Sequence, residues 1–191
     1  MKESVLNAFE LIKSVYLQGG TLYCCGNGGS AADSEHIVGE LLKSFKKPRK
    51  IDENVAKNLL KLGEGGAYLL SKLEGALPAV SLVSQTGILT AFSNDKSWDT
   101  AIAQQLYGLG KQGDCLLALS TSGNSKNCMY AVLTAKAKGI KTVAFAGALG
   151  GSLKEVCDEC ICVPAIETYQ AQELHLPIYH CLCAMLEEEF F

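Results

Sequence analysis

Two polar side chains with chemical potential share one face of a predicted helix in the first quarter of the chain. His36 and Glu40 are four residues apart within residues 31–42, whose pattern predicts a helix. Side chains at this spacing stack on the same helix face. An imidazole beside a carboxylate can exchange protons with a ligand, and the two can also bind a zinc ion together. We therefore assign this helix face to a candidate site.

A glycine-rich loop precedes that helix. The sequence CGNGGS at residues 25–30 joins a short β-prone apolar run at 21–25 to the helix start. Glycines let the backbone approach a ligand, and the free N–H groups of a helix N-terminus point toward it. The loop is neither G-x-G-x-x-G nor a P-loop, which argues against a nucleotide. An anion site is the functional interpretation, and glycines that serve only the turn geometry are the structural alternative.

A second loop repeats this arrangement later in the chain. The sequence STSGNS at residues 120–125 follows the apolar run 114–119 and opens a predicted helix at 126–138. Its four hydroxyl groups surround one glycine at a helix start. With no lysine or arginine inside the loop, the site suits a phosphate monoester held by N–H and hydroxyl donors. Helix capping alone requires only one such residue, so we favour phosphate binding.

The other two histidines, His175 and His180, lie in the predicted C-terminal helix. A lone histidine on an apolar helix is more often a core residue than a ligand, and His175 is the candidate for that role. Together with Glu40 and Gln172, His180 would form a metal site with oxygen and nitrogen ligands. Such a ligand set is closest in type to that of zinc. Helix geometry leaves its partner open: Glu173, seven residues earlier, aligns better than Gln172, which is about 80° around the helix.

Composition limits the class of protein. The chain has 191 residues with 48% hydrophobic content, enough for one substantial core, and a net charge of −3. The basic residues are scattered, so we expect no nucleic-acid partner; the cluster at 43–50, which holds Arg49, is either a solvated loop or a phosphate contact. The chain shows no signal peptide and no apolar run of transmembrane length, so we expect a cytoplasmic protein without a membrane partner.

Nine cysteines are an odd number, and together with the missing secretory signal they predict free thiols in a reducing compartment. The spacing Cys157-x-x-Cys160-x-Cys162 suggests a zinc ribbon. However, Cys160 and Cys162 alternate with their neighbours as a half-buried strand would, and no second pair is suitably spaced. We expect these cysteines to be small buried hydrophobic residues.

Strand and helix patterns alternate along the chain, which predicts an α/β fold with a parallel sheet and right-handed crossovers. Ligands bind such sheets at the carboxyl ends of the strands, where both loops fall. Residues 51–75 differ in character: two helical stretches around Gly63–Gly66 predict an inserted helical hairpin or a mobile flap. The final helix is expected to bend at Pro177. The predicted strands are 21–25, 79–83, 114–119, 141–146 and 159–163.

Three motifs in order, CGNGGS at 25–30, STSGNS at 120–125 and QELH at 172–175, resemble the sugar-isomerase (SIS) domain family, most closely its phosphoheptose isomerase branch. The likeness covers about residues 1–45 and 76–191. It implies one SIS domain over residues 1–191, with a five-stranded parallel sheet flanked by helices. It also implies a homotetramer with active sites between subunits.

The resemblance also implies an activity, the isomerisation of a sugar phosphate between aldose and ketose, with sedoheptulose 7-phosphate as substrate. Glu40 then corresponds to the base that moves a proton between C1 and C2, with His180 as its partner. The implied zinc ligands are His36, Glu40, Gln172 and His180, which favours Gln172 over Glu173. The implied substrate contacts are Asn27, Gly28, Gly29, Ser30, Asn94, Asp95, Ser120, Thr121, Ser122, Ser125 and Gln172.

Two departures from the family pattern concern the substrate more than the reaction. Ala31 and Ala32 replace bulkier polar residues, and residues 51–75 are extra. The family also contains a replication-initiator-associating protein that keeps the fold without the isomerase residues. The ending Cys181-Leu182-Cys183 resembles that branch, but Glu40 and His180 do not. The alternative function is therefore a non-catalytic phosphosugar-binding regulator or adaptor, which would bind a sugar phosphate without turning it over.

Overall fold

Five parallel strands form the sheet of this protein, whose computed structural model describes residues 1–191. Their spatial order is β2-β1-β3-β4-β5, so the chain leaves β1 for one edge and then returns to build the other side. The predicted α/β fold with a five-stranded parallel sheet is confirmed. The strands are β1 Leu22–Cys25, β2 Ala79–Ser81, β3 Cys115–Leu119, β4 Lys141–Ala146 and β5 Glu159–Cys162.

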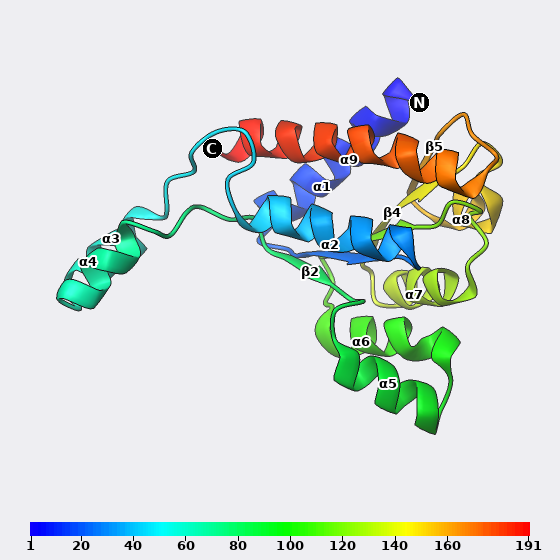
Figure 1. The fold of residues 1–191 in the computed structure, drawn as a ribbon, viewed down its shortest axis with the longest axis horizontal. Helices are drawn as coiled ribbons and strands as arrows, with labels where there is room; N and C mark the ends of the chain where they lie inside the picture. Colours follow the sequence, from blue (N-terminus) through cyan, green and yellow to red (C-terminus); the bar gives the residue numbers. More distant parts are fainter.

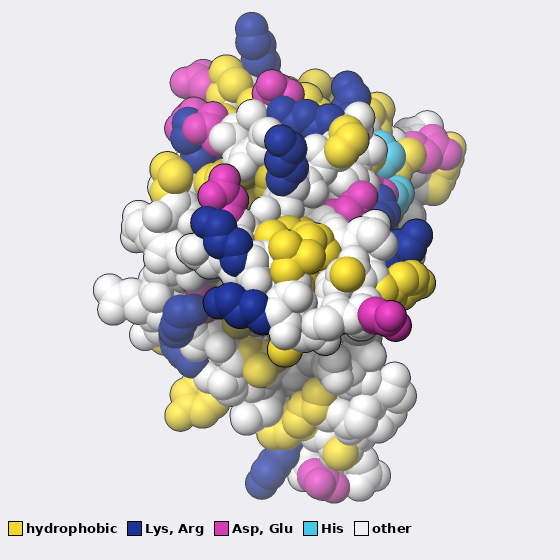
Figure 2. Space-filling model, turned by 90° about the vertical axis from the view of Figure 1, so that its left-hand side faces the viewer, with side chains coloured by type: hydrophobic (Ala, Val, Ile, Leu, Met, Phe, Trp, Pro, Cys, Tyr) yellow, Lys and Arg dark blue, Asp and Glu magenta, His cyan; other side chains and the backbone are white.

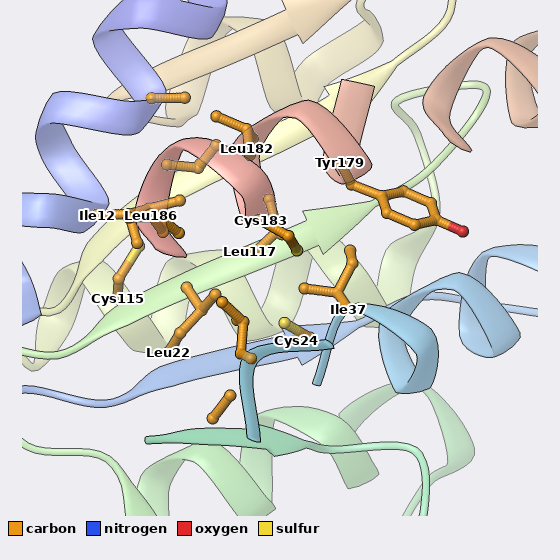
Figure 3. Close-up of a cluster of buried hydrophobic side chains, with 14 of the residues drawn as sticks. Ile12, Leu22, Cys24, Ile37, Cys115, Leu117, Tyr179, Leu182, Cys183 and Leu186 are labelled. Carbon is orange, nitrogen blue, oxygen red and sulfur yellow. The ribbon is translucent and has the colours of Figure 1, made fainter. Parts of the chain in front are cut away.

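Helices cover both faces of the sheet (Figure 1). One face carries α1 (Lys2–Leu17), α2 (Gly29–Leu42) and the long α9 (Thr168–Phe190), and the other carries α6 (Ala101–Leu109), α7 (Lys126–Ala137) and α8 (Gly151–Val156). Alternate residues of β1 and β3 enter the two cores, so both strands are buried throughout, as expected of a covered parallel sheet. Figure 3 shows the first core, where Ile37 of α2 meets Tyr179 and Cys183 of α9 over Cys24.

The segment 51–75 forms a helical hairpin that projects from the body at the left of Figure 1. Helices α3 (Glu53–Leu60) and α4 (Glu64–Leu70) pack against each other, and Gly66 is the one buried residue in them. A side chain at Gly66 would lie 1.8 Å from the carbonyl oxygen of Leu59, so the close crossing requires glycine. Figure 2 views the molecule from this side and shows apolar side chains at its surface among lysines and acidic residues.

The polar sequence Ser93-Asn94-Asp95 predicts a turn, but these residues instead form the last turn of α5 (Thr86–Asp95). The hydroxyl of Ser93 donates to the carbonyl of Leu89 one turn earlier, so the helix itself satisfies this polar side chain. A short 3₁₀ helix, η1 (Trp98–Thr100), then leads into α6. Helix α8 was not predicted, because the glycines at its start are typical of a turn.

Arg49 fits neither of the two sequence interpretations, because it is a buried structural residue with 3% of its surface exposed. Its Nε donates to Glu187 on α9 at 2.7 Å, while its two terminal nitrogens donate to the carbonyls of Leu41 and Glu40 at 2.7 and 2.9 Å. These carbonyls belong to the last turn of α2, where no helical partner remains for them. Arg49 therefore fastens the end of α2 to α9.

The nine cysteines are all free. Five are buried and Cys181 is exposed, whereas Cys157, Cys160 and Cys162, which the sequence predicted to be buried, are only partly buried. The sulfur atoms of Cys160 and Cys162 lie 3.8 Å apart on the edge strand β5. No third ligand completes a metal group there, so the structure has no zinc ribbon.

Candidate active site

The two loops singled out in the sequence lie side by side at the carboxyl edge of the sheet. Their strands are neighbours, with Cys25 of β1 opposite Ala118 of β3. The strand order reverses between β1 and β3, and open α/β sheets bind ligands in the crevice at such a switch point. The amides of Asn27 and Asn127 join the loops by two reciprocal hydrogen bonds of 2.9 and 2.7 Å. Sequence analysis missed Asn127, which gave no local signal beyond its place in the first turn of α7.

The glycine-rich loop brings Gln172 to the start of α2. Gly28 has a φ of +54°, which glycine adopts readily, and it precedes the first helical residue Gly29. A side chain at Gly29 would lie 2.2 Å from the amide of Gln172, so the loop needs glycine there to accept the side chain from α9. Gly28, Gly29 and Gln172, all predicted substrate contacts, are thus neighbours. Ser30 is buried beside them in the first turn of α2.

The serine- and threonine-rich loop presents its hydroxyl groups at the start of α7. Ser120 is buried, and its Oγ lies 2.9 Å from the Oγ of Ser125, while the Oγ of Ser122 accepts from the N–H of Asn124. Thr121 is half-buried beside them. Although Ser125 occupies the N-cap position of α7, no side-chain hydrogen bond caps the helix from it. Capping therefore does not explain why this loop holds four hydroxyl groups.

His36, Glu40 and His180 meet between α2 and α9, as the sequence predicted. The Nε2 of His36 lies 3.3 Å from Oε1 of Glu40, and the rings of His36 and His180 are 5.0 Å apart at their centroids. Lys43, which sequence analysis did not assign, places its ammonium 2.6 Å from Oε2 of Glu40. The carboxylate of Glu40 is thus held between a cation and an imidazole, with 13% of the side chain exposed.

Tyr179 and Asp33 support this cluster from behind. The hydroxyl of Tyr179 donates to Oδ1 of Asp33 at 3.3 Å and lies 3.0 Å from Nδ1 of His36. Burial raises the pKa of the Asp33 carboxyl and also that of the Tyr179 phenol. The position of Asp33 near the start of the helix predicts an interaction with the helix dipole, but Asp33 is instead a buried partner of α9. Such contacts hold the ring of His36 in one orientation toward Glu40.

His175 is a core residue, as predicted. It is fully buried, packs against Phe145 and has its Nε2 3.3 Å from the carbonyl of Ala146. Burial lowers the pKa of this imidazole, which favours its neutral form.

The predicted contacts Asn94 and Asp95 do not join either loop within the chain. Both are exposed at the end of α5, and the amide of Asn94 donates to the carboxylate of Asp95 at 2.9 Å.

The polar cluster has the donor chemistry of a zinc site, with two imidazoles, a carboxylate and an amide among the predicted ligands. The Nε2 of His180 is buried without a hydrogen-bond partner, as a nitrogen reserved for an ion would be. The side chains do not converge on one point, since no three of the His, Cys, Asp and Glu residues are arranged to hold an ion. The side chain of Gln172 lies beside Gly29. Along α9, Gln172 is eight residues, or about 12 Å, from His180. The donor types fit zinc, and binding one ion would require these side chains to move toward a common point.

A considerable distance separates the polar cluster from the loops within one chain. Glu40 lies eleven residues beyond Gly29 on α2, which is about 16 Å along the helix axis. Carbon–carbon bonds of about 1.5 Å make a seven-carbon sugar phosphate roughly 10 Å long. The backbone separation between Gly29 and Glu40 along α2 thus exceeds the length of one such molecule.

Comparison with known proteins agrees with this fold and these motifs. A family model described as SIS domain matches residues 65–147. The chain is 39% identical to a phosphoheptose isomerase of a Nitratiruptor species over 87% of this chain and 75% of that protein. It is 36% identical to the phosphoheptose isomerase of Clostridium acetobutylicum over 99% of this chain and 84% of that protein. The chain therefore belongs to the phosphoheptose isomerase family of SIS-domain proteins.

Solved structures give the same assignment. A phosphoheptose isomerase from Neisseria gonorrhoeae superimposes with a TM-score of 0.79 at 30% identity, covering 97% of this chain and 86% of that one. One from Francisella tularensis gives 0.80 at 28% identity with the same coverage. The family resemblance drawn from the three motifs is confirmed. As for membranes, none of the helices combines the length and apolar character needed to cross a bilayer.

Proposed function

We propose that this protein isomerises sedoheptulose 7-phosphate to D-glycero-D-manno-heptose 7-phosphate, as a phosphosugar aldose–ketose isomerase. The observation that carries the proposal is the identity of 36–39% with proteins named phosphoheptose isomerase over nearly the whole chain. The presence of Glu40 beside His36 and His180 supports it with suitable chemistry. The adaptor alternative is not favoured, because relatives across the family carry the isomerase name and the acid–base residues are retained.

The chain's residues suggest how the proton moves. Glu40 takes the proton from the carbon next to the carbonyl and returns it to the other carbon of a cis-enediol. His180, within reach of the same cluster, moves the proton between the two oxygens. Lys43 keeps the Glu40 side chain in place between reaction steps.

The test of this function is a turnover screen of C5 to C7 ketose phosphates, with the product identified by NMR. Conversion of sedoheptulose 7-phosphate faster than that of the shorter sugars supports the proposal. Tight binding of these sugars with no turnover of any of them would transfer support to the adaptor alternative.

Zinc is the cofactor we propose, held by His36, Glu40 and His180 with Gln172 as the fourth ligand. When bound, it would polarise the substrate carbonyl. The purified protein is expected to contain about one zinc per chain, and His36→Ala to lose it, because a structural or catalytic zinc needs three or four protein ligands. Elemental analysis of protein purified with metal-free reagents measures the zinc content of both proteins.

The two residues considered as the zinc ligand on α9, Gln172 and Glu173, provide a matched pair of variants. Gln172→Ala is expected to weaken zinc binding, whereas Glu173→Ala, on the exposed neighbouring position, should leave it unchanged. Zinc retained in His36→Ala at the wild-type level would assign the metal to other residues.

Phosphate binding at the 120–125 loop leads to a separate prediction. Ser120→Ala combined with Ser122→Ala is expected to raise KM for the sugar phosphate at least tenfold, about 1.4 kcal/mol, because two hydroxyl donors are lost. Steady-state kinetics measure it, with Ser14→Ala on α1 as a control, since the Ser14 hydroxyl bonds only to its own helix. An unchanged KM in the double variant would place the phosphate elsewhere.

We further propose a homotetramer in which active sites lie between subunits, in the cytoplasm and without nucleic-acid or membrane partners. The separation of about 16 Å between Gly29 and Glu40 along α2 supports it, because a second chain can supply the distant half of each site.

A further inference from the structure

A hollow of about 350 Å³ opens at the switch point between β1 and β3. Its volume lies at the lower end of the range for small-molecule sites. Both loops border it, through Asn27 on one side and Ser125 on the other. The residues that line it are Asn27, Trp98, Asp99, Ser125, Lys126 and Asn127. Three of these, Trp98, Asp99 and Lys126, have no place in the site described so far.

Trp98 forms the one large apolar surface of this hollow. It is the chain's single tryptophan, lies in the short helix η1 and is 60% exposed. A single exposed aromatic residue is common on protein surfaces and by itself indicates nothing. Here the indole borders amides and hydroxyls that the sequence had already assigned to a ligand. A flat apolar ring beside polar groups matches a sugar, whose C–H face packs on the ring while its hydroxyls bond to the rim.

The two charged residues of the hollow indicate which chemical groups its ligand carries. Lys126 is exposed and forms no ion pair, and it occupies the first residue of α7, where the helix dipole disfavours a cation. An anion between the ammonium and the helix start would relieve this repulsion. Asp99, which accepts from the Ser97 hydroxyl, can accept further hydroxyl donors. A ligand that carries both an anionic group and hydroxyl groups satisfies both residues, and a sugar phosphate is such a ligand.

We propose that Trp98 is a specificity-determining residue of the sugar phosphate site. Its indole packs against the carbon chain of the sugar, while Lys126 adds positive charge to the phosphate anchor at the 120–125 loop. This inference rests on the proposed function for the identity of the sugar. It concerns substrate selection and assigns no proton transfer to Trp98.

Because Trp98 is the only tryptophan, its fluorescence reports on the hollow directly. Sedoheptulose 7-phosphate added to Glu40→Gln protein, which is expected to bind without turnover, should change the emission intensity or wavelength in a saturable manner. Inorganic phosphate, which lacks a carbon chain, should produce a smaller change at saturation. In the wild-type background, Trp98→Ala should raise KM for sedoheptulose 7-phosphate about tenfold and change kcat less than threefold, with Trp98→Phe restoring most of the loss.

A matched control is Tyr107→Ala, which removes another exposed aromatic side chain, at 64% exposure on α6, outside the hollow. It should leave KM at the wild-type value. Unchanged Trp98 emission together with wild-type KM in Trp98→Ala would overturn the inference, and turnover by the wild-type protein would then leave the proposed function standing. Saturable emission changes without turnover in the wild-type protein would retain the hollow as a sugar phosphate site and reject the isomerase activity.

Discussion

Glu40→Gln is expected to lower kcat for sedoheptulose 7-phosphate by about 10²–10⁴ with only a modest change in KM. Glutamine keeps the size of the side chain and part of its hydrogen bonding to Lys43 but cannot accept the carbon-bound proton. Exchange of the C1 or C2 proton with solvent deuterium during turnover measures the step directly. The wild-type protein should exchange this proton, and Glu40→Gln should not.

Two controls show whether the lower kcat of Glu40→Gln comes from loss of the catalytic base or from loss of structure or bound metal. Glu35→Gln changes a carboxylate one residue before His36 that is exposed and accepts from Ser84, so its kcat should equal that of the wild type. Zinc content must be measured in the same samples, because Glu40 is also a proposed ligand. A Glu40→Gln protein that keeps its zinc and exchanges the proton at the wild-type rate would remove Glu40 from the mechanism.

The same variant tests whether sites are shared between chains. If one chain supplies the phosphate loop and another supplies Glu40, mixed assemblies of Glu40→Gln with Ser120→Ala/Ser122→Ala contain some sites with both halves intact. Activity at low substrate should then rise above that of either variant alone after the two are unfolded and refolded together. Activity that remains at the mean of the two parents would mean that each chain carries a complete site.

The parts of the fold and site that the sequence predicted are those that local patterns determine. Alternating strands and helices, apolar runs and glycine-rich turns define the parallel sheet and place both loops at its carboxyl edge. The four-residue spacing of His36 and Glu40 likewise determines their shared face. By contrast, the Asn27–Asn127 pair and the Tyr179–Asp33 contact join residues 100 or more positions apart. Such pairs follow from the packing of α2 on α9 and of β1 beside β3, which no local pattern encodes.

Arg49 shows the same limit for charge patterns. Its neighbours Lys46, Lys47 and Lys50 made the segment resemble a solvated basic loop. The partner that decides its role, Glu187, lies 138 residues away on α9 and is also buried, with 1% of its side chain exposed. Glu187 additionally accepts from the backbone N–H groups of Phe45 and Lys46, at 2.8 and 2.7 Å. The carboxylate of Glu187 thus holds in place the connection that follows α2, the helix that carries His36 and Glu40.

Arg49→Ala is accordingly expected to lower the free energy of unfolding by about 3–5 kcal/mol, because it leaves the carboxylate of Glu187 buried without its cation. Urea denaturation followed by circular dichroism measures this. Lys47→Ala is the matched control, since Lys47 pairs with the largely exposed Glu188 at 3.0 Å and such surface pairs contribute at most about 1 kcal/mol. Equal losses in the two variants would contradict the assignment of Arg49 as a buried structural residue.

The pH dependence of stability gives an independent measure of the same ion pair. Burial raises the pKa of Glu187, but hydrogen bonds from the Phe45 N–H and the Arg49 guanidinium outweigh it and lower the pKa to about 2, from an ordinary 4.5. A carboxyl whose folded pKa is depressed stabilises the fold above its unfolded pKa and loses that contribution as pH falls through the folded value. The wild-type free energy of unfolding should therefore fall between about pH 5 and pH 2 more steeply than that of Glu187→Gln, which has no carboxyl to protonate. Parallel curves for the two proteins over this range would show that Glu187 is not held ionised by Arg49, and the loss in Arg49→Ala would then need another cause.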